Sequence, residues 1–365
     1  MRAVVLTEPG RRPELVDVDL APPGPGEVLV DIAAAGVCHS DLHVLRGEWE
    51  LPLPLVMGHE GSGVVAAVGA GVTSLSPGDH VVLSWYAPCG HCARCLLGRE
   101  TQCITNGRVV AAGGVLFDGT SRLSSGGRQL HHYLGVSSFA EQAVVPASGA
   151  IKVRDDAPLD LVALVGCAIA TGVGAVTHAA QVESGSSVVV IGTGGVGLSV
   201  VQGARLAGAS RIVAVDLVAA KLAAALRLGA TDVVDASGTD PVEAVLELLP
   251  DGADYAFDAI GRPVTTEQAI RMLGLGGAAV VVGLPAQGER ASFEPLTLAE
   301  ADQRIIGTNY GSIRPSQDVP RLVDWAMDGR LDLESMVSAR RPLGEAADAL
   351  VDLAEGRALR QLLVP

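Results

Sequence analysis

Residues 186–216 read SSVVVIGTGGVGLSVVQGARLAGASRIVAVD, and this stretch decides the fold of the second half of the chain. An apolar run of strand length leads into a glycine-rich turn, a segment of helix length and a second apolar run. The same alternation continues through AAKLAAALRLGA and DVVD. It is typical of βαβ units, in which helices cover both faces of a parallel sheet. We therefore predict an α/β fold with a doubly wound parallel sheet here.

The turn in this stretch has the spacing of a dinucleotide-binding loop. Gly192, Gly194 and Gly197 form G-x-G-x-x-G between strand and helix, where glycine permits a tight turn and close approach of a pyrophosphate. Asp216 ends the next strand, where a carboxylate can accept both ribose hydroxyls of NAD and repels the 2′-phosphate of NADP. The sequence thus predicts NAD as the cofactor. Lys221 could reach the adenosine ribose or be a solvated helix lysine.

Four cysteines lie close together in CGHCARCLLGRETQC, residues 89–103. Thiolates spaced C-x2-C-x2-C-x7-C can surround one tetrahedral zinc ion, and such a closed site is structural. Disulfides and an iron–sulfur cluster are the alternatives. The start MRAVVLTEPG does not resemble a signal peptide, which disfavours disulfides. The predicted ligands are Cys89, Cys92, Cys95 and Cys103.

The two remaining cysteines point to a second metal site. Cys38 and Cys167 lie in GVCHSD and VGCAIATG, and His59 lies between them in MGHEGSG. Each of the three alone could be a buried structural residue. Together, two sulfurs and one imidazole are a ligand set of catalytic zinc sites that leave room for a substrate.

Length and composition limit the class of protein. A chain of 365 residues is expected to form two domains, and 45 glycines with 48% hydrophobic residues indicate a turn-rich globular protein. A net charge of −15 argues against nucleic acid and anionic membrane surfaces as partners. The apolar stretches are shorter than the ~20 residues that span a bilayer. We expect a soluble, cytoplasmic protein.

The first part of the chain is rich in short β-like runs divided by glycine and proline, such as AVVL, EVLVDIAAAG and DHVVLSW. This spacing favours a compact, barrel-like β domain. Residues 106–134 are polar, glycine-rich and weakly periodic, so we expect an irregular loop there. That loop could form a substrate rim or a subunit contact.

Read in order, GVCHSDLH, GHEGSGVV, the four-cysteine run, GCAIATG, GTGGVG and the tail EGRALRQLLVP resemble the zinc-dependent medium-chain alcohol dehydrogenase family over essentially the whole chain. The resemblance implies a GroES-like, β-rich catalytic domain of residues 1–168 and 310–365, and a Rossmann NAD-binding domain of residues 169–309. It further implies two zinc ions per subunit and a homodimer or homotetramer. The apolar strand GGAAVVVGLP could line the subunit contact as an unpaired edge.

The resemblance also assigns roles to single residues. Cys38, His59 and Cys167 would bind the catalytic zinc, with Glu60 as an occasional alternate ligand and Asp41 orienting His59. Ser40 and His43 would relay the proton away from the alcohol, and within CHSDLH we favour this role over the alternatives of a turn hydroxyl and a surface histidine. The remaining expected contacts are His39 and Arg360 at the pyrophosphate, Thr171, Gly195 and Val196 around the cofactor, and Trp85 and Trp49 at the substrate pocket.

His39 departs from family members that carry arginine at this position. Because an imidazole has fewer donors and only partial charge, we expect looser cofactor binding than with arginine.

The sequence leaves two substrate classes open. Several segments look closest to the class III branch, which oxidises S-hydroxymethyl adducts of glutathione, and related bacterial enzymes use mycothiol adducts or primary and aromatic alcohols. The loop LRGEWELPLPLVM departs from that branch, and His43 stands where it commonly has tyrosine. Arg122 could contact a carboxylated substrate or be structural. We favour a primary or aromatic alcohol, with a thiol adduct as the alternative.

Two further readings of the fold stay open. One is a non-catalytic NAD-binding protein, because fold alone does not establish activity. The other is a zinc-free reductase that uses NADPH, which Asp216 and the intact ligand set oppose.

Overall fold

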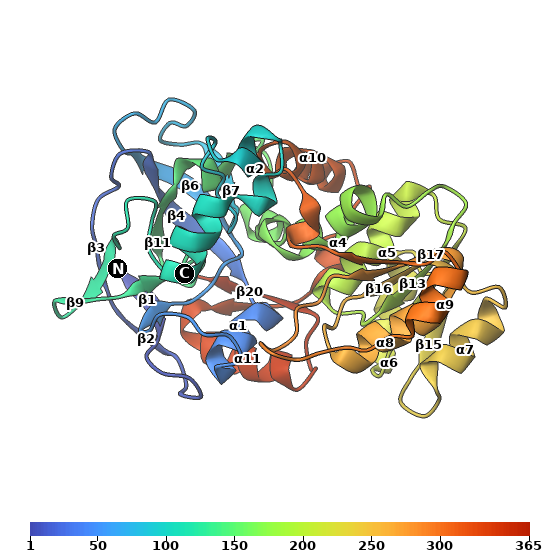
Figure 1. The fold of residues 1–365 in the computed structure, drawn as a ribbon. Helices are drawn as coiled ribbons and strands as arrows, with labels where there is room; N and C mark the ends of the chain where they lie inside the picture. Colours follow the sequence, from blue (N-terminus) through green and yellow to red (C-terminus); the bar gives the residue numbers. More distant parts are fainter. The chain divides into compact units, whose positions relative to one another are not determined.

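The computed structural model describes all 365 residues. The chain forms two compact units, shown in Figure 1. The β-rich unit comprises Met1–Cys167 and Arg314–Pro365, and the parallel-sheet unit comprises Ala168–Ile313. The chain therefore leaves the first unit once and returns to it.

The largest sheet of the β-rich unit has seven strands in the order β12-β7-β6-β4-β20-β19, with β11 also paired to β4. Apart from the parallel pair β19–β20, its neighbours are antiparallel. Strand β4 forms its centre, because it pairs with β6, β11 and β20. The strands are β4 (Glu27–Gly36), β6 (Gly61–Val68), β7 (His80–Leu83), β11 (Gln142–Pro146), β12 (Ala150–Lys152), β19 (Val337–Pro342) and β20 (Arg360–Val364).

Two smaller sheets complete the β structure of this unit. Their orders are β10-β5-β1-β2 and β3-β8-β9. The strands are β1 (Arg2–Leu6), β2 (Glu14–Asp17), β3 (Asp19–Leu20), β5 (Leu55–Val56), β8 (Leu123–Ser125), β9 (Arg128–Gln129) and β10 (His131–His132).

Short helices connect these strands. They are α1 (His39–Arg46), α2 (Ala93–Leu96), η1 (Glu100–Gln102), η2 (Asn106–Ala111), η3 (Ala147–Gly149), α3 (Leu159–Val162), η4 (Ala163–Gly166), α10 (Pro315–Met327), η7 (Glu334–Met336), η8 (Leu343–Glu345) and α11 (Ala346–Ala354). The expectation of an irregular loop over residues 106–134 is therefore only partly right. Helix η2 and the three short strands β8, β9 and β10 lie within it. Strands β8 and β10 pair with β3 and β5, which are distant in sequence, so local composition does not show this pairing.

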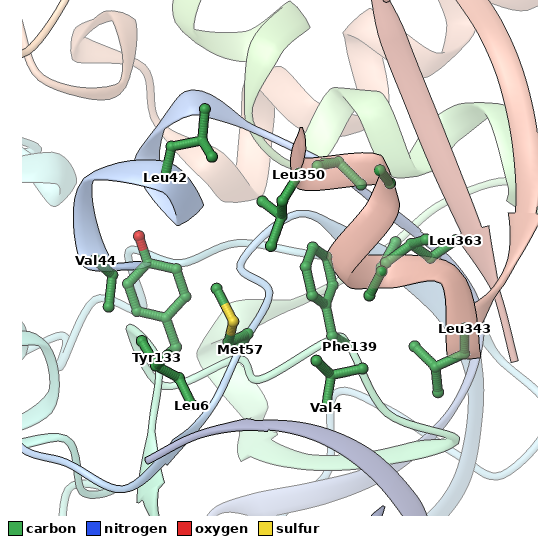
Figure 2. Close-up of a cluster of buried hydrophobic side chains, with 14 of the residues drawn as sticks. Val4, Leu6, Leu42, Val44, Met57, Tyr133, Phe139, Leu343, Leu350 and Leu363 are labelled. Carbon is green, nitrogen blue, oxygen red and sulfur yellow. The ribbon is translucent and has the colours of Figure 1, made fainter. Parts of the chain in front are cut away.

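A buried hydrophobic cluster packs α1 and α11 against the sheet β10-β5-β1-β2 (Figure 2). Leu42 and Val44 from α1 and Leu350 from α11 face the same cluster as Tyr133 and Phe139. Burying each large apolar side chain contributes about 1.5–3 kcal/mol. The cluster thus holds α1 in place, and with it Cys38, the candidate metal ligand at the N-cap of α1.

The parallel-sheet unit confirms the predicted α/β pattern. Its six strands are all parallel, in the order β15-β14-β13-β16-β17-β18. The strands are β13 (Ser187–Ile191), β14 (Arg211–Asp216), β15 (Asp232–Asp235), β16 (Ala253–Asp258), β17 (Leu273–Val281) and β18 (Arg304–Gly307). The helices are α4 (Ala168–Gly174), η5 (Ala175–Ala180), α5 (Gly195–Ala207), α6 (Ala219–Leu228), α7 (Pro241–Leu248), α8 (Pro263–Arg271), α9 (Pro295–Glu300) and η6 (Tyr310–Ser312).

The structure corrects one expectation about this sheet. The run GGAAVVVGLP was expected to be an unpaired edge, but β17 lies between β16 and β18. The edge strands are β15 and β18, and β18, with the sequence RIIG, is short and mostly exposed. Sequence pattern could not place this edge, because strand order depends on how the chain crosses the sheet.

No single helix is long and apolar enough to cross a membrane, although the bent pair Leu159–Gly166 and Ala168–Ala180 meets the length and composition test.

Candidate active site and metal centres

Four potential ligands from separate segments meet inside the β-rich unit. Cys38 follows β4 at the N-cap of α1, His59 and Glu60 immediately precede β6, and Cys167 follows η4. Their ligand atoms all lie within 4.8 Å of one another, and all four residues are buried. The structure thus brings together the residues that the sequence proposed for the catalytic metal.

The surroundings of His59 suit a cation. Its Nε2 is buried and has no hydrogen-bond partner, while its Nδ1 lies 3.3 Å from Oδ1 of Asp41. The other oxygen of Asp41 accepts the backbone N–H of Cys38 at 2.9 Å. Burial alone would lower the pKa of His59, but Asp41 and Cys38 outweigh it and raise the pKa to about 10. Groups that favour a proton on Nε2 also favour a metal ion there.

The pKa values of the two cysteines shift in opposite directions. The hydrogen bond from Cys167 lowers the pKa of Cys38 against the effect of burial, and His59 lowers it further. The same hydrogen bond, with burial, raises the pKa of Cys167. The protein groups around Cys38 thus favour its thiolate, and thiolate is the form that binds zinc.

Glu60 does not point freely into the cluster, because Arg360 donates a buried hydrogen bond to its Oε2. Burial raises the pKa of Glu60 to about 7, although Arg360 opposes this shift. Gly36 leaves the space that Glu60 needs, since a Cβ there would lie 2.4 Å from Oε1. Arg360, expected at the cofactor pyrophosphate, is thus held by Glu60 in this structure.

The four-cysteine lobe forms a second compact ligand set. The sulfurs of Cys89, Cys92, Cys95 and Cys103 lie within 4.8 Å of one another. All the cysteines are free thiols, so the structure contains no disulfide. Sequence reasoning missed Asn106, which is fully buried and donates its backbone N–H to the sulfur of Cys103 at 3.4 Å. Its side-chain oxygen accepts the N–H of Ala87 at 3.1 Å, which fixes the base of the lobe.

The proposed relay residues lie on α1, directly after Cys38. The backbone oxygen of Ser40 accepts a hydrogen bond of 2.9 Å from the hydroxyl of Tyr133. Tyr133 is fully buried, and its ring is 5.3 Å from that of His59 in an edge-on arrangement. Sequence reasoning missed this residue because only the fold brings it to α1. The imidazole of His43 contacts Glu48 and stacks on Trp49.

The two tryptophans have different surroundings. The ring of Trp85 is 6.5 Å from that of His59, roughly perpendicular to it, so Trp85 lies beside the ligand cluster. Trp49 packs on His43, with ring centroids 4.5 Å apart. His39 is exposed at the first turn of α1.

Arg122 is structural in this fold. It pairs with both oxygens of Glu27 at 2.8 Å and also with Asp118, and its side chain is only 12% exposed. Because the guanidinium of Arg122 already pairs with these two carboxylates, we do not assign it to binding of a carboxylated substrate.

The glycine loop of the parallel-sheet unit fits a dinucleotide. Gly192 has a φ of +88°, and a Cβ on Gly197 would lie 1.7 Å from the oxygen of Gly192, so both positions require glycine. By contrast, a Cβ on Gly194 would meet nothing within 4 Å, which leaves open space above the N-terminus of α5. Partial positive charge at such a terminus favours a phosphate. Gly195 and Val196 form the first turn of α5.

Asp216 ends β14 as expected and is held by the loop itself. Its Oδ2 accepts the backbone N–H and the hydroxyl of Thr193 at 2.7 and 2.9 Å. Its Oδ1 accepts the N–H groups of Leu217 and Val218. Lys221 lies on α6 and is partly buried, and Thr171 lies on α4, 8% exposed.

Comparisons with known proteins agree with both units. Residues 24–155 match the alcohol dehydrogenase GroES-like domain, and residues 195–328 match the zinc-binding dehydrogenase domain. An S-(hydroxymethyl)glutathione dehydrogenase of Escherichia coli O1:K1 / APEC is 39% identical over 367 residues, which cover 99% of each protein.

Solved structures are similar over the full chain. The crystal structure of an alcohol dehydrogenase zinc-binding domain protein from Burkholderia ambifaria is 40% identical with a TM-score of 0.95. That of benzyl alcohol dehydrogenase from Acinetobacter calcoaceticus is 36% identical with a TM-score of 0.94. Each comparison covers 100% of this chain and 98% of the other.

Proposed function

The chain belongs to the zinc-dependent medium-chain alcohol dehydrogenase family, and we propose that it transfers hydride between a primary or aromatic alcohol and NAD. The observation that carries this proposal is the buried set Cys38, His59 and Cys167 around the unpartnered Nε2 of His59. A non-catalytic protein of this fold would not need both this ligand set and an intact glycine loop in one chain.

We propose two zinc ions per subunit. Cys38, His59 and Cys167 would hold one, with Glu60 near it, and the four-cysteine lobe would hold the other. When bound, the first zinc supplies Lewis acidity toward an alcohol oxygen and NAD supplies the hydride acceptor. The lobe, with four sulfurs, leaves no position for a substrate.

The residues of the chain bind, orient and move protons around that centre. Asp41 holds the ring of His59 through Nδ1, which keeps Nε2 directed at the ligand cluster. Ser40 would take the alcohol proton through its hydroxyl, and His43 would accept it for release to solvent. Trp85 would narrow the space beside the site and exclude water.

On the cofactor side, the open space above Gly194 would receive the pyrophosphate, and Asp216 the adenosine ribose. Thr171 and Val196 would contact the nicotinamide, and Lys221 the ribose. His39 would approach the pyrophosphate. Arg360 would either keep its hydrogen bond to Glu60 alone or divide its donors between Glu60 and the pyrophosphate.

An aromatic or primary alcohol is preferred over a thiol adduct as substrate for two reasons. Trp85 and Trp49 offer apolar aromatic surface, and a relative of high structural similarity is a benzyl alcohol dehydrogenase. The alternative is an S-hydroxymethyl thiol adduct, as in the name of the Escherichia coli relative.

Formation of NADH should be measured with benzyl alcohol, ethanol, a long-chain primary alcohol, and formaldehyde combined with glutathione or mycothiol. Turnover of a simple alcohol supports the proposal. Turnover of the thiol adducts alone would replace it by the alternative.

We further propose a cytoplasmic homodimer or homotetramer. The edge strand β18 supports the oligomer, because Ile305 on it is 38% exposed and Leu275 on the adjoining strand β17 is 86% exposed. Sedimentation equilibrium would give the number of subunits, and a monomer would contradict the proposal.

A further inference from the structure

We propose that Glu48 is a positioning residue for His43, and that it keeps the hydrogen of the imidazole on Nδ1 and the ring in one orientation. This inference rests on the proposed function, in which His43 accepts the proton that leaves the alcohol. It adds a residue from the loop after α1, which contains no metal ligand.

The contact between the two side chains defines the tautomer. Nδ1 of His43 lies within hydrogen-bond distance of Oε2 of Glu48. An ionised carboxylate only accepts hydrogen bonds, so Nδ1 must carry the hydrogen. In a neutral imidazole the lone pair then lies on Nε2, which makes Nε2 the atom that can accept a proton.

Two further groups restrain this pair. The ring of His43 stacks on Trp49 with an interplanar angle of 18° and a centroid separation of 4.5 Å, which limits rotation of the imidazole. Arg46 lies 3.9 Å from the second oxygen of Glu48 and pairs with that side of the carboxylate. The side chain of His43 is only 16% exposed and that of Glu48 31%, so water competes weakly for their contact.

The backbone turn after α1 places Glu48 over His43. Gly47 adopts the left-handed conformation with a φ of +71° and donates its N–H to the oxygen of Val44 at 3.1 Å. Glu48 donates its N–H to the oxygen of His43 at 2.9 Å. These two bonds are those of a Schellman motif, in which the side chains at the positions of His43 and Glu48 commonly make an apolar contact. This chain has a carboxylate and an imidazole there instead.

The nature of the motif supplies a sharp test. Glu48→Leu restores the apolar contact that usually ends such a helix, so a purely structural role predicts unchanged or higher stability and unchanged turnover. A positioning role predicts that kcat falls about 10-fold with KM within about 2-fold, because the general base loses its fixed tautomer. Glu48→Gln keeps an acceptor and should stay within about 3-fold of wild type. Glu50→Leu, an exposed change in the same loop, is the matched control.

A spectroscopic measurement tests the same point without turnover. Imidazole nitrogen shifts of the protein labelled at its eight histidines report the tautomer, and His43→Ala identifies the signal. We expect the Nδ1–H tautomer of His43 in the wild type and in Glu48→Gln, and a shift toward Nε2–H in Glu48→Leu.

The outcomes separate this inference from the proposed function. If the wild type oxidises alcohols but Glu48→Leu keeps either the tautomer or the full kcat, the inference is wrong and the function stands. If the wild type oxidises no alcohol, the proposed function fails. The tautomer shift alone then decides whether Glu48 positions His43.

Discussion

Gly58 allows His59 to reach the ligand cluster, and replacing it with alanine should damage the site. Gly58 has a φ of +87°, and a Cβ there would lie 2.4 Å from Cδ1 and 2.5 Å from the backbone nitrogen of Phe139. That nitrogen cannot move freely, since it donates to the oxygen of Met57 at 2.9 Å. Figure 2 shows Met57 and Phe139 in the same buried cluster.

The expected cost has two parts. The left-handed backbone costs an alanine about 1–2 kcal/mol, and overpacking against Phe139 costs about 1–3 kcal/mol more. Gly71→Ala is the matched control, because Gly71 has a φ of +79° but a Cβ there would meet nothing within 4 Å. The difference between the two variants should therefore be about 1–3 kcal/mol, the steric part alone.

Urea unfolding of both variants and the wild type measures this difference, and metal analysis measures the zinc retained. We expect Gly58→Ala to lose zinc from the site that contains His59, while Gly71→Ala keeps its full content. Equal stability and equal zinc in the two variants would refute the steric reasoning.

Three other predictions concern pH, metal affinity and cofactor affinity. Burial lowers the pKa of His132 from 6.5 to about 3, so the unfolded chain binds more protons between these values and stability falls as the pH drops through that window. At about pH 5 the free energy of unfolding is lower by roughly 2 kcal/mol because of His132. His132→Gln should remove that part of the pH dependence measured by urea unfolding. If the free energy of unfolding of the variant falls with pH as steeply as that of the wild type, the prediction is wrong. Asp41→Asn should weaken zinc binding at His59 by about 10–100-fold, measured by competition with a chelator. Asp31→Asn, an exposed change on β4, should leave the zinc affinity unchanged. Equal zinc affinities of the two variants would refute the orienting role of Asp41. His39→Arg should tighten NADH binding measured by fluorescence titration, and an unchanged dissociation constant would show that His39 does not limit it.

The parts of the fold that could be predicted are those with local signatures. The run from Ser187 to Asp216 combines a strand, a glycine turn, a helix and a second strand, and each step has its own residue pattern, so the α/β class followed directly. The spacing of the cysteines likewise predicted the four-cysteine lobe, whose sulfurs lie close together in the structure.

The missed features depend on contacts across long stretches of chain. Tyr133 reaches Ser40 across 93 positions, and Arg360 reaches Glu60 across 300. No periodicity or spacing encodes such pairs, because they arise only when the β-rich unit closes. The same reason explains the misplaced sheet edge, which depends on the crossover that sets β18 outside β17.

The central claim is that a metal held by Cys38, His59 and Cys167 is required for NAD-linked alcohol oxidation. Its most direct test is zinc content and NADH formation from benzyl alcohol for the wild type and Cys38→Ser, with NADH binding measured in parallel. We predict that Cys38→Ser loses one of the two proposed zinc ions and all NADH formation while it still binds NADH. NADH formation by Cys38→Ser at the wild-type rate would contradict the account.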